Sequence, residues 1–102
     1  MFTDKVVVIT GGAHGIGKTT GDEFRKNGAH VCVIDKSEND YFTGDIAEEQ
    51  TLCTFSKKVI TEFGRIDYLI NNALPIMKGI DSCSYDEFNY ALRVGVTAPF
   101  YL

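Results

Sequence analysis

Cysteine and histidine are scarce in this sequence, and neither residue type is clustered. The three cysteines, Cys32, Cys53 and Cys83, lie too far apart for the close pairs of a zinc site and are too few for a disulfide scaffold. The two histidines have no acidic or cysteine companions that would complete a set of metal ligands. We therefore expect no metal site, and we expect free thiols that are buried or partly buried.

Long apolar runs and concentrated basic regions are also missing. No stretch approaches the roughly 18 apolar residues of a transmembrane helix, and the N-terminus lacks a signal-peptide pattern. We therefore expect no membrane partner and a cytoplasmic location. Ten lysines and arginines are scattered among 14 acidic residues, which gives a net charge of −4. Nucleic acid requires a concentrated basic face, so we expect no nucleic-acid partner.

The sequence does contain enough apolar material for one small domain. It has 102 residues, of which 44% are hydrophobic, and it shows no internal repeat, low-complexity tract or linker. We therefore treat residues 1–102 as a single domain.

The most informative stretch is VVVITGGAHGIGKTT, residues 6–20. Residues 5–10 form a β-branched run typical of a buried strand, and the glycines after it open a helix. The free N–H groups and positive dipole end of a helix N-terminus attract phosphate, and glycine allows a phosphate to approach the backbone closely. A nucleotide is therefore the expected ligand.

This stretch fits two different phosphate-binding loops. Gly12, Gly17, Lys18 and Thr19 match the P-loop pattern literally, with Asp35 as a candidate magnesium ligand. Gly11, Gly15 and Gly17 fit a dinucleotide loop instead, in which Asp35 lies about twenty residues beyond Gly15.

Asp35 has a specific meaning in the dinucleotide interpretation. A carboxylate at the tip of the second strand can accept hydrogen bonds from both hydroxyls of an adenosine ribose, and it would repel a 2′-phosphate. Lys36 is the only immediate counterweight to this negative charge. Asp35 therefore favours NAD over NADP and Lys36 opposes this preference, although Asp35 taken alone is equally well explained as a solvated turn residue.

The rest of the chain favours the dinucleotide interpretation. Apolar residues from Leu52 to Phe63 have the spacing of one helix face, and Gly64 is expected to end that helix. A fourth strand is expected over residues 66–71, followed directly by Asn72 and Ala73. Open α/β sheets bind ligands at the carboxyl ends of their strands, and a P-loop fold has no need of amides there.

With these features the sequence resembles the short-chain dehydrogenase/reductase family along its whole length. Four features carry the resemblance: Thr10-Gly11-x-x-x-Gly15-Ile16-Gly17, the strand-ending Asp35, Asp45-Ile46 after a short third strand, and Asn71-Asn72-Ala73 after the fourth. The resemblance implies an α/β fold with a Rossmann-like, doubly wound parallel sheet. This chain would carry only its first half, with strand order 3-2-1-4.

The resemblance also implies a role for each matching position around NAD. The residues expected to contact the cofactor are Gly11, His14, Gly15, Ile16 and Gly17 at the pyrophosphate, Asp35 with Lys36 beside it at the adenosine ribose, Asp45 and Ile46 at the adenine, and Asn72 and Ala73 alongside. Asn71 is expected to be a structural amide that ties neighbouring strands together. Lys18 becomes a solvated residue of the first helical turn.

Three departures from the family pattern carry expectations of their own. Leu74 replaces a glycine and is expected to crowd the loop. The connection from Asp35 to Asp45 is too short for the usual crossover helix, which leaves the adenine side more open. Gly95 stands where the family has a catalytic-site asparagine, in a final helix that Ser84 and Glu87 open with a capping box and that carries Phe88, Ala91 and Leu92 on one face.

No residue of this chain is assigned a catalytic role. The family's catalytic serine and Tyr-x-x-x-Lys motif come later in the chain than residue 102, and neither Tyr85 nor Tyr90 has a lysine four residues on. We expect a fragment or an unusually small relative of an NAD-dependent oxidoreductase that moves hydride between nicotinamide and an alcohol or carbonyl substrate. The alternatives are a noncatalytic dinucleotide-binding module and a P-loop ATPase or kinase. The partner is a small-molecule substrate, and self-association is expected through the exposed edge of the fourth strand and the last helix.

Overall fold

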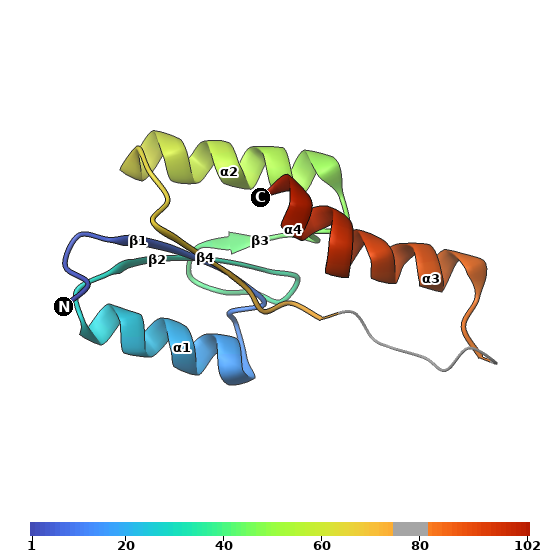
Figure 1. Ribbon diagram of the computed structural model, residues 1–102, viewed down its shortest axis with the longest axis horizontal. Coiled ribbons are helices and arrows are strands. Elements are labelled where there is room, and N and C mark those ends of the chain that lie inside the picture. Colours follow the sequence, from blue (N-terminus) through green and yellow to red (C-terminus); the bar gives the residue numbers. More distant parts are fainter. Residues whose placement is uncertain (75–81) are drawn as a thin grey trace.

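The fold is an α/β arrangement in which helices cover both faces of a small sheet (Figure 1). The computed structural model describes residues 1–74 and 82–102. Its elements in chain order are β1 (Val6–Thr10), α1 (Gly15–Lys26), β2 (His30–Asp35), β3 (Phe42–Thr43), α2 (Glu49–Phe63), β4 (Tyr68–Asn71), α3 (Tyr85–Leu92), a π-helical turn (Arg93–Thr97) and α4 (Ala98–Tyr101). Gly64 ends α2 in a left-handed conformation, as predicted.

The sheet is fully parallel with strand order β3-β2-β1-β4, which confirms the predicted order 3-2-1-4. Val8 of β1 lies opposite Cys32 on one side and Leu69 on the other. The fourth strand starts at Tyr68, two residues later than expected. The Asp67 carboxylate just before it accepts a hydrogen bond of 2.8 Å from the Val6 N–H.

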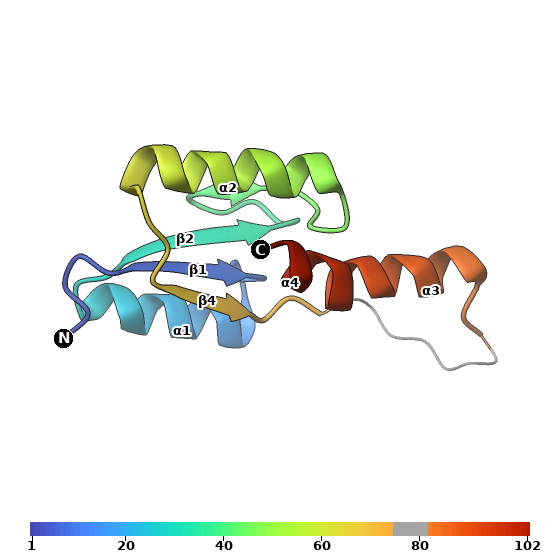
Figure 2. The same ribbon diagram turned by 45° about the horizontal axis from the view of Figure 1, so that its top comes forward.

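Two apolar cores follow from the alternation of side chains along β1. Val6 and Val8 point to the face covered by α2, where they pack with Phe55. Val7 and Ile9 point to the opposite face, which α1 covers (Figure 2). Because both faces of β1 are covered, all five of its residues are buried, as the apolar run in the sequence predicted.

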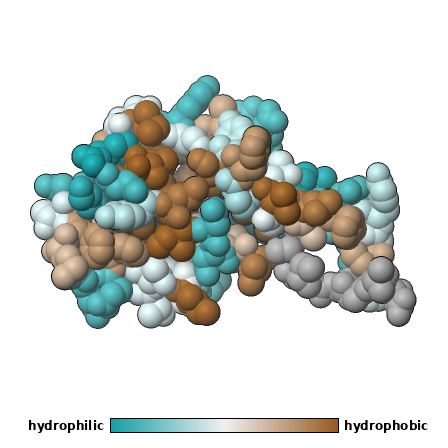
Figure 3. Space-filling model, viewed as in Figure 1, coloured by the Kyte–Doolittle hydropathy of each residue, from teal (hydrophilic) through white to brown (hydrophobic). Residues whose placement is uncertain are grey.

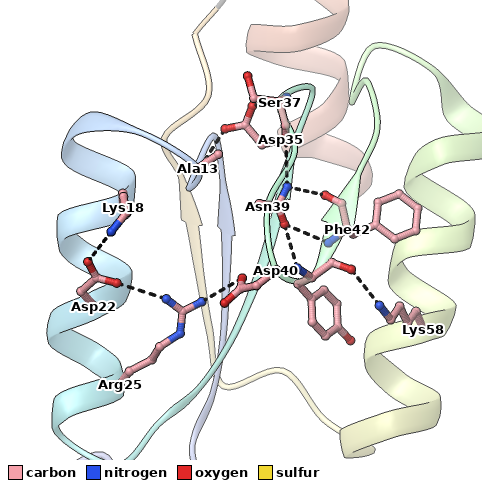
Figure 4. Close-up of polar contacts among 11 residues, drawn as sticks. Ala13, Lys18, Asp22, Arg25, Asp35, Ser37, Asn39, Asp40, Phe42 and Lys58 are labelled. Carbon is pink, nitrogen blue, oxygen red and sulfur yellow. Dashed lines mark hydrogen bonds and ion pairs between the residues drawn. The ribbon is translucent and has the colours of Figure 1, made fainter.

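The connection from β2 to β3 contains no helix, as the short spacing predicted, and a turn around Asn39 takes its place (Figure 4). The Asn39 side chain accepts hydrogen bonds from the Tyr41 and Phe42 N–H groups and donates to the carbonyls of Ser37 and Phe42. Arg25 of α1 adds an exposed ion pair with Asp40. These contacts give the connection a defined course without a crossover helix.

The C-terminal helices pack less completely than the rest of the chain. Val94 and Ala98 are buried in the core beside α2, whereas Phe88 on the expected apolar face of α3 is 57% exposed. Figure 3 shows apolar atoms along α3 and over the middle of the molecule in this view. The face that contains Phe88 and Leu92 is therefore not a core face within this chain, and the burial begins one turn later, in the π-helical turn.

The helices in the described parts of the chain include none with both the length and the apolar character needed to cross a membrane.

β4 pairs with β1 alone, so its other edge is open within residues 1–74 and 82–102.

Ser84 caps α3 in the predicted capping box. Its hydroxyl accepts a hydrogen bond of 3.1 Å from the Glu87 N–H, and the Glu87 carboxylate accepts one of 3.2 Å from the Ser84 N–H. We expect Ser84→Ala to destabilise α3 by about 1 kcal/mol, because the capping oxygen is lost. Amide hydrogen exchange in α3 should then be roughly fivefold faster. Ser84→Asp keeps an acceptor and serves as the control, and equal exchange in both variants would contradict the capping role.

Candidate functional site

A cavity of about 940 Å³ opens at the carboxyl ends of β1, β2 and β4 and is closed on one side by α3. Of the residues predicted to contact a cofactor, seven line it: Gly11, Asp35, Lys36, Asp45, Ile46, Asn72 and Ala73. The other four, His14, Gly15, Ile16 and Gly17, lie where α1 begins and do not line the cavity. Their contact with a cofactor stays a prediction.

The chain turns sharply as it leaves β1. Gly11 has φ +70°, a conformation that favours glycine, and its N–H donates a hydrogen bond of 2.9 Å to the Ile34 carbonyl. The start of α1 lies against this turn because Gly17 has no side chain. A Cβ at Gly17 would come within 2.4 Å of the Gly11 carbonyl oxygen and 2.5 Å of the Asn72 Nδ2. Gly17 therefore allows the helix to approach the loop closely.

The end of β4 is fastened to the same loop. The buried Thr10 hydroxyl accepts hydrogen bonds from the N–H groups of Asn72 and Ala73, at 3.1 and 3.0 Å. The Asn72 amide donates to the Gly11 carbonyl at 3.0 Å. The sequence analysis expected Asn71 to be the structural amide at this point. In the structure the Asn72 side chain makes this contact, and Asn71 is exposed. Leu74 is 87% exposed and does not crowd the loop, which corrects that expectation.

The N-terminus of α1 is suited to an anion. His14 is the N-cap residue and makes no side-chain cap hydrogen bond, and the first turn contains no acidic residue. N–H groups of this turn are therefore left without a helical partner and lie at the positive end of the helix dipole.

Asp35 ends β2 beside the glycine loop (Figure 4). One carboxylate oxygen accepts a hydrogen bond of 3.0 Å from the Ala13 N–H, and the other accepts one of 2.9 Å from the Ser37 N–H. A carboxylate has about four acceptor positions, so both oxygens can accept a further donor. Asp35 is thus held in place by the backbone and is more than a solvated turn residue.

Lys18 lies outside the cavity, where its ammonium makes an exposed ion pair of 2.9 Å with Asp22 on the next turn of α1. The expectation of a solvated first-turn lysine is confirmed. A P-loop would need this ammonium at the phosphates, so the contact gives that alternative no support.

The end of the cavity near Asp45, where the adenine is predicted to lie, contains a contact that was not predicted from the sequence. The Tyr90 hydroxyl of α3 donates a hydrogen bond of 2.9 Å to Asp45 and accepts one of 3.0 Å from the Lys36 ammonium. The hydrogen bond that the Lys36 ammonium donates to Tyr90 is the main reason that the pKa of Lys36 is raised above its ordinary value, and the Asp45 charge acts in the same direction.

Five residues of α3 and the π-helical turn line the cavity without having been predicted for it, the polar Asp86, Glu87, Tyr90 and Arg93 and the apolar Val94. Their spacing places them along one side of the helix, and this polar stripe was the available signal. The sequence analysis named only the apolar face of the same helix, which contains Phe88, Ala91 and Leu92.

The described residues contain no group of three or more His, Cys, Asp or Glu side chains placed to hold a metal ion. Gly95 is exposed and has open space where a Cβ would lie. Because it is glycine, it supplies no side-chain amide at that position.

The residues present fit a dinucleotide. The cavity is in the usual size range of small-molecule sites, and its lining includes Gly11, Asn72 and Ala73 at the ends of β1 and β4. The close packing around Gly17 and the uncapped start of α1 suit a diphosphate. Asp35 offers fixed acceptors for hydroxyl groups.

Comparison with known proteins gives a consistent result. The sequence profile of the short chain dehydrogenases matches residues 5–102. An uncharacterised oxidoreductase of Thermotoga maritima is 34% identical, with 99% of this chain and 46% of that protein covered. Momilactone A synthase of Oryza sativa subsp. japonica is 31% identical over 94% of this chain and 41% of its own length.

Solved structures with a similar fold agree with the sequence comparison. An apo SCOR enzyme from Clostridium thermocellum superposes with a TM-score of 0.88 at 40% identity, which covers 96% of this chain and 46% of that chain. The present chain therefore spans about half the length of the relatives that it matches.

Proposed function

This chain belongs to the short-chain dehydrogenase family, and on that premise we propose that its cavity binds NAD for an oxidoreductase acting on an alcohol or carbonyl compound. The observation that carries the proposal is the clamp at the strand ends. Thr10 and Asn72 fix β4 to the glycine loop, and Gly17 brings α1 against it, so a diphosphate would meet a rigid backbone surface.

Each part of the cavity has a separate task in this proposal. The backbone from Gly11 and the start of α1 would hold the diphosphate, with His14, Gly15 and Ile16 nearest its phosphates. Asp35 would accept the adenosine ribose hydroxyls, Asp45 and Ile46 would flank the adenine, and Asn72 and Ala73 would run beside the cofactor.

The nicotinamide supplies hydride transfer when the cofactor is bound. The contribution of this chain is to bind and orient, because none of its residues is assigned to the proton transfer that accompanies hydride movement. A small-molecule substrate is proposed for the whole protein, and self-association through β4 and the last helix stays a prediction.

The preference for NAD over NADP is proposed from charge. Among the described residues, the cavity lining contains four carboxylates, those of Asp35, Asp45, Asp86 and Glu87, against two cations, Lys36 and Arg93. A 2′-phosphate adds further negative charge beside Asp35 and would be repelled.

Asp35→Asn tests this preference with little change in shape. We expect NAD binding to weaken roughly tenfold, because the uncharged Asn oxygen is a weaker acceptor and the Asn amide nitrogen cannot accept the hydrogen bond from the Ala13 or Ser37 N–H. We also expect discrimination against NADP to diminish, because the negative charge is lost. Isothermal titration with NAD and NADP measures both effects. Unchanged selectivity would contradict the role of Asp35.

Lys18→Ala is the matched control, because it removes a charge close to the loop but outside the cavity. Dinucleotide affinity should stay within about twofold of the parent value, as expected for an exposed ion pair. A loss of nucleotide binding in this variant, with ATP and magnesium as the ligand, would contradict the proposed function.

A further inference from the structure

Tyr90 lies beside Lys36 and Arg93, the two cations of the cavity lining among the described residues. The Lys36 ammonium lies 5.2 Å from the centre of the Tyr90 ring and donates to its hydroxyl, and the Arg93 guanidinium lies 5.8 Å from the same ring. No other lysine or arginine lines the cavity in the parts of the chain that the structure describes. One aromatic side chain therefore lies beside both of these cations.

The hydroxyl of Tyr90 is well placed to hold an ammonium. Its proton is directed to Asp45 at 2.9 Å, so its oxygen lone pairs are available to accept from Lys36 at 3.0 Å. The chain from ammonium to phenol to carboxylate has a charged group at each end, and hydrogen bonds with an ionised partner are stronger than neutral ones.

Asp35 forms no ion pair with Lys36 among the described residues, although the two residues are adjacent in sequence. Each oxygen of the Asp35 carboxylate accepts one backbone N–H, from Ala13 or Ser37, and no ion pair within 4.0 Å joins this carboxylate to Lys36 in the part of the chain that the structure describes. The negative charge at the proposed ribose position is thus left without its nearest counterion.

We propose that Tyr90 is a positioning residue for cofactor selectivity: by holding Lys36 against α3 and Asp45, it keeps the ammonium from the 2′ position of the ribose and so disfavours NADP. This inference rests on the proposed function, since it assigns the selectivity of the same cavity. It places a specificity determinant 55 residues beyond Asp35, on a helix that contributes nothing to the glycine loop.

The long, flexible lysine side chain makes the position of the ammonium dependent on its partner. Released from the phenol, Lys36 can turn toward the neighbouring Asp35 end of the cavity and neutralise a 2′-phosphate. Tyr90→Phe keeps the aromatic ring, and with it the packing of α3, but removes both hydrogen bonds.

The test is a double-mutant cycle on the full-length protein, with dissociation constants for NAD and NADP measured by calorimetry. We expect Tyr90→Phe to tighten NADP roughly tenfold relative to NAD, the scale of one new hydrogen bond to a charged group. Lys36→Met in the parent should leave the ratio of the two constants within about twofold. In the Tyr90→Phe background, Lys36→Met should abolish the gain.

Adenosine 5′-phosphate and adenosine 2′,5′-bisphosphate repeat the comparison without the nicotinamide half, so the readout does not depend on catalysis. An unchanged ratio in Tyr90→Phe, or weaker NADP binding, would overturn the inference. A selective loss of NADP affinity in Lys36→Met of the parent would show that Lys36 already serves the phosphate, which also overturns the inference. A parent protein that binds neither dinucleotide would contradict the proposed function itself.

Discussion

Gly17→Ala is expected to weaken dinucleotide binding by roughly two orders of magnitude, equivalent to about 2.7 kcal/mol. The new methyl group would lie 2.4 Å from the Gly11 carbonyl oxygen and 2.5 Å from the Asn72 amide nitrogen. The Gly11 carbonyl oxygen belongs to the backbone and cannot move aside as the Asn72 side chain can. The hydrogen bond between Asn72 and Gly11 would therefore be pushed apart, and the loop with it.

Isothermal titration with NAD measures this loss, and chemical denaturation shows how much of it is a loss of stability. Gly95→Ala is the matched control, because a Cβ at Gly95 meets nothing within 4 Å and the residue lies in a helical turn. It should bind NAD normally and be as stable as the parent or up to about 1 kcal/mol more stable. If Gly17→Ala and Gly95→Ala bound NAD equally well, the close approach of α1 to the loop would have no part in binding.

Phe55→Ala is expected to reduce the free energy of unfolding by about 3–5 kcal/mol. Phe55 is fully buried between the sheet and α2, and the rings of Tyr41 and Phe42 contact it edge-on at 6.1 and 5.5 Å between centroids. Its removal leaves a cavity in the larger of the two apolar cores, and total stabilities of small proteins are themselves only about 5–15 kcal/mol.

Urea denaturation monitored by circular dichroism checks this value. Ile60→Ala on the same helix is the control, since Ile60 is 49% exposed and its truncation should cost no more than about 0.5 kcal/mol. A loss below about 1 kcal/mol for Phe55→Ala would mean that α2 packs on the sheet less closely than the structure shows.

The parts of the fold that the sequence predicts are those governed by local rules. The apolar run before the glycines predicts β1, the apolar spacing from Leu52 to Phe63 predicts α2, and the capping box of Ser84 and Glu87 predicts the start of α3. The structure contains all three. Strand order needed more than local rules, since it was implied by the family resemblance, and the pairing of β2 and β4 on either side of β1 confirms it.

The misplaced details depend on contacts between distant residues. Which of Asn71 and Asn72 reaches back to Gly11 is decided by the position at which β4 ends, and the two amides are chemically identical. The inward face of α3 is decided by Tyr90 meeting Lys36 and Asp45, 54 and 45 residues away. The sequence offered a polar stripe and an apolar stripe on one helix, and periodicity alone cannot state which of them faces the cavity.

The two ends of the proposed cofactor site differ in how strongly they resist partial unfolding, because one is attached to the buried strand β1 and the other is formed by α3. β1 is paired on both sides and covered on both faces, so it belongs to the segments that lose structure last, and the loop at its end is fastened to it through Thr10 and Gly11. α3 has no buried residue of its own. Fraying of the C-terminal helices would therefore open the wall beside the adenine while the diphosphate seat stays assembled.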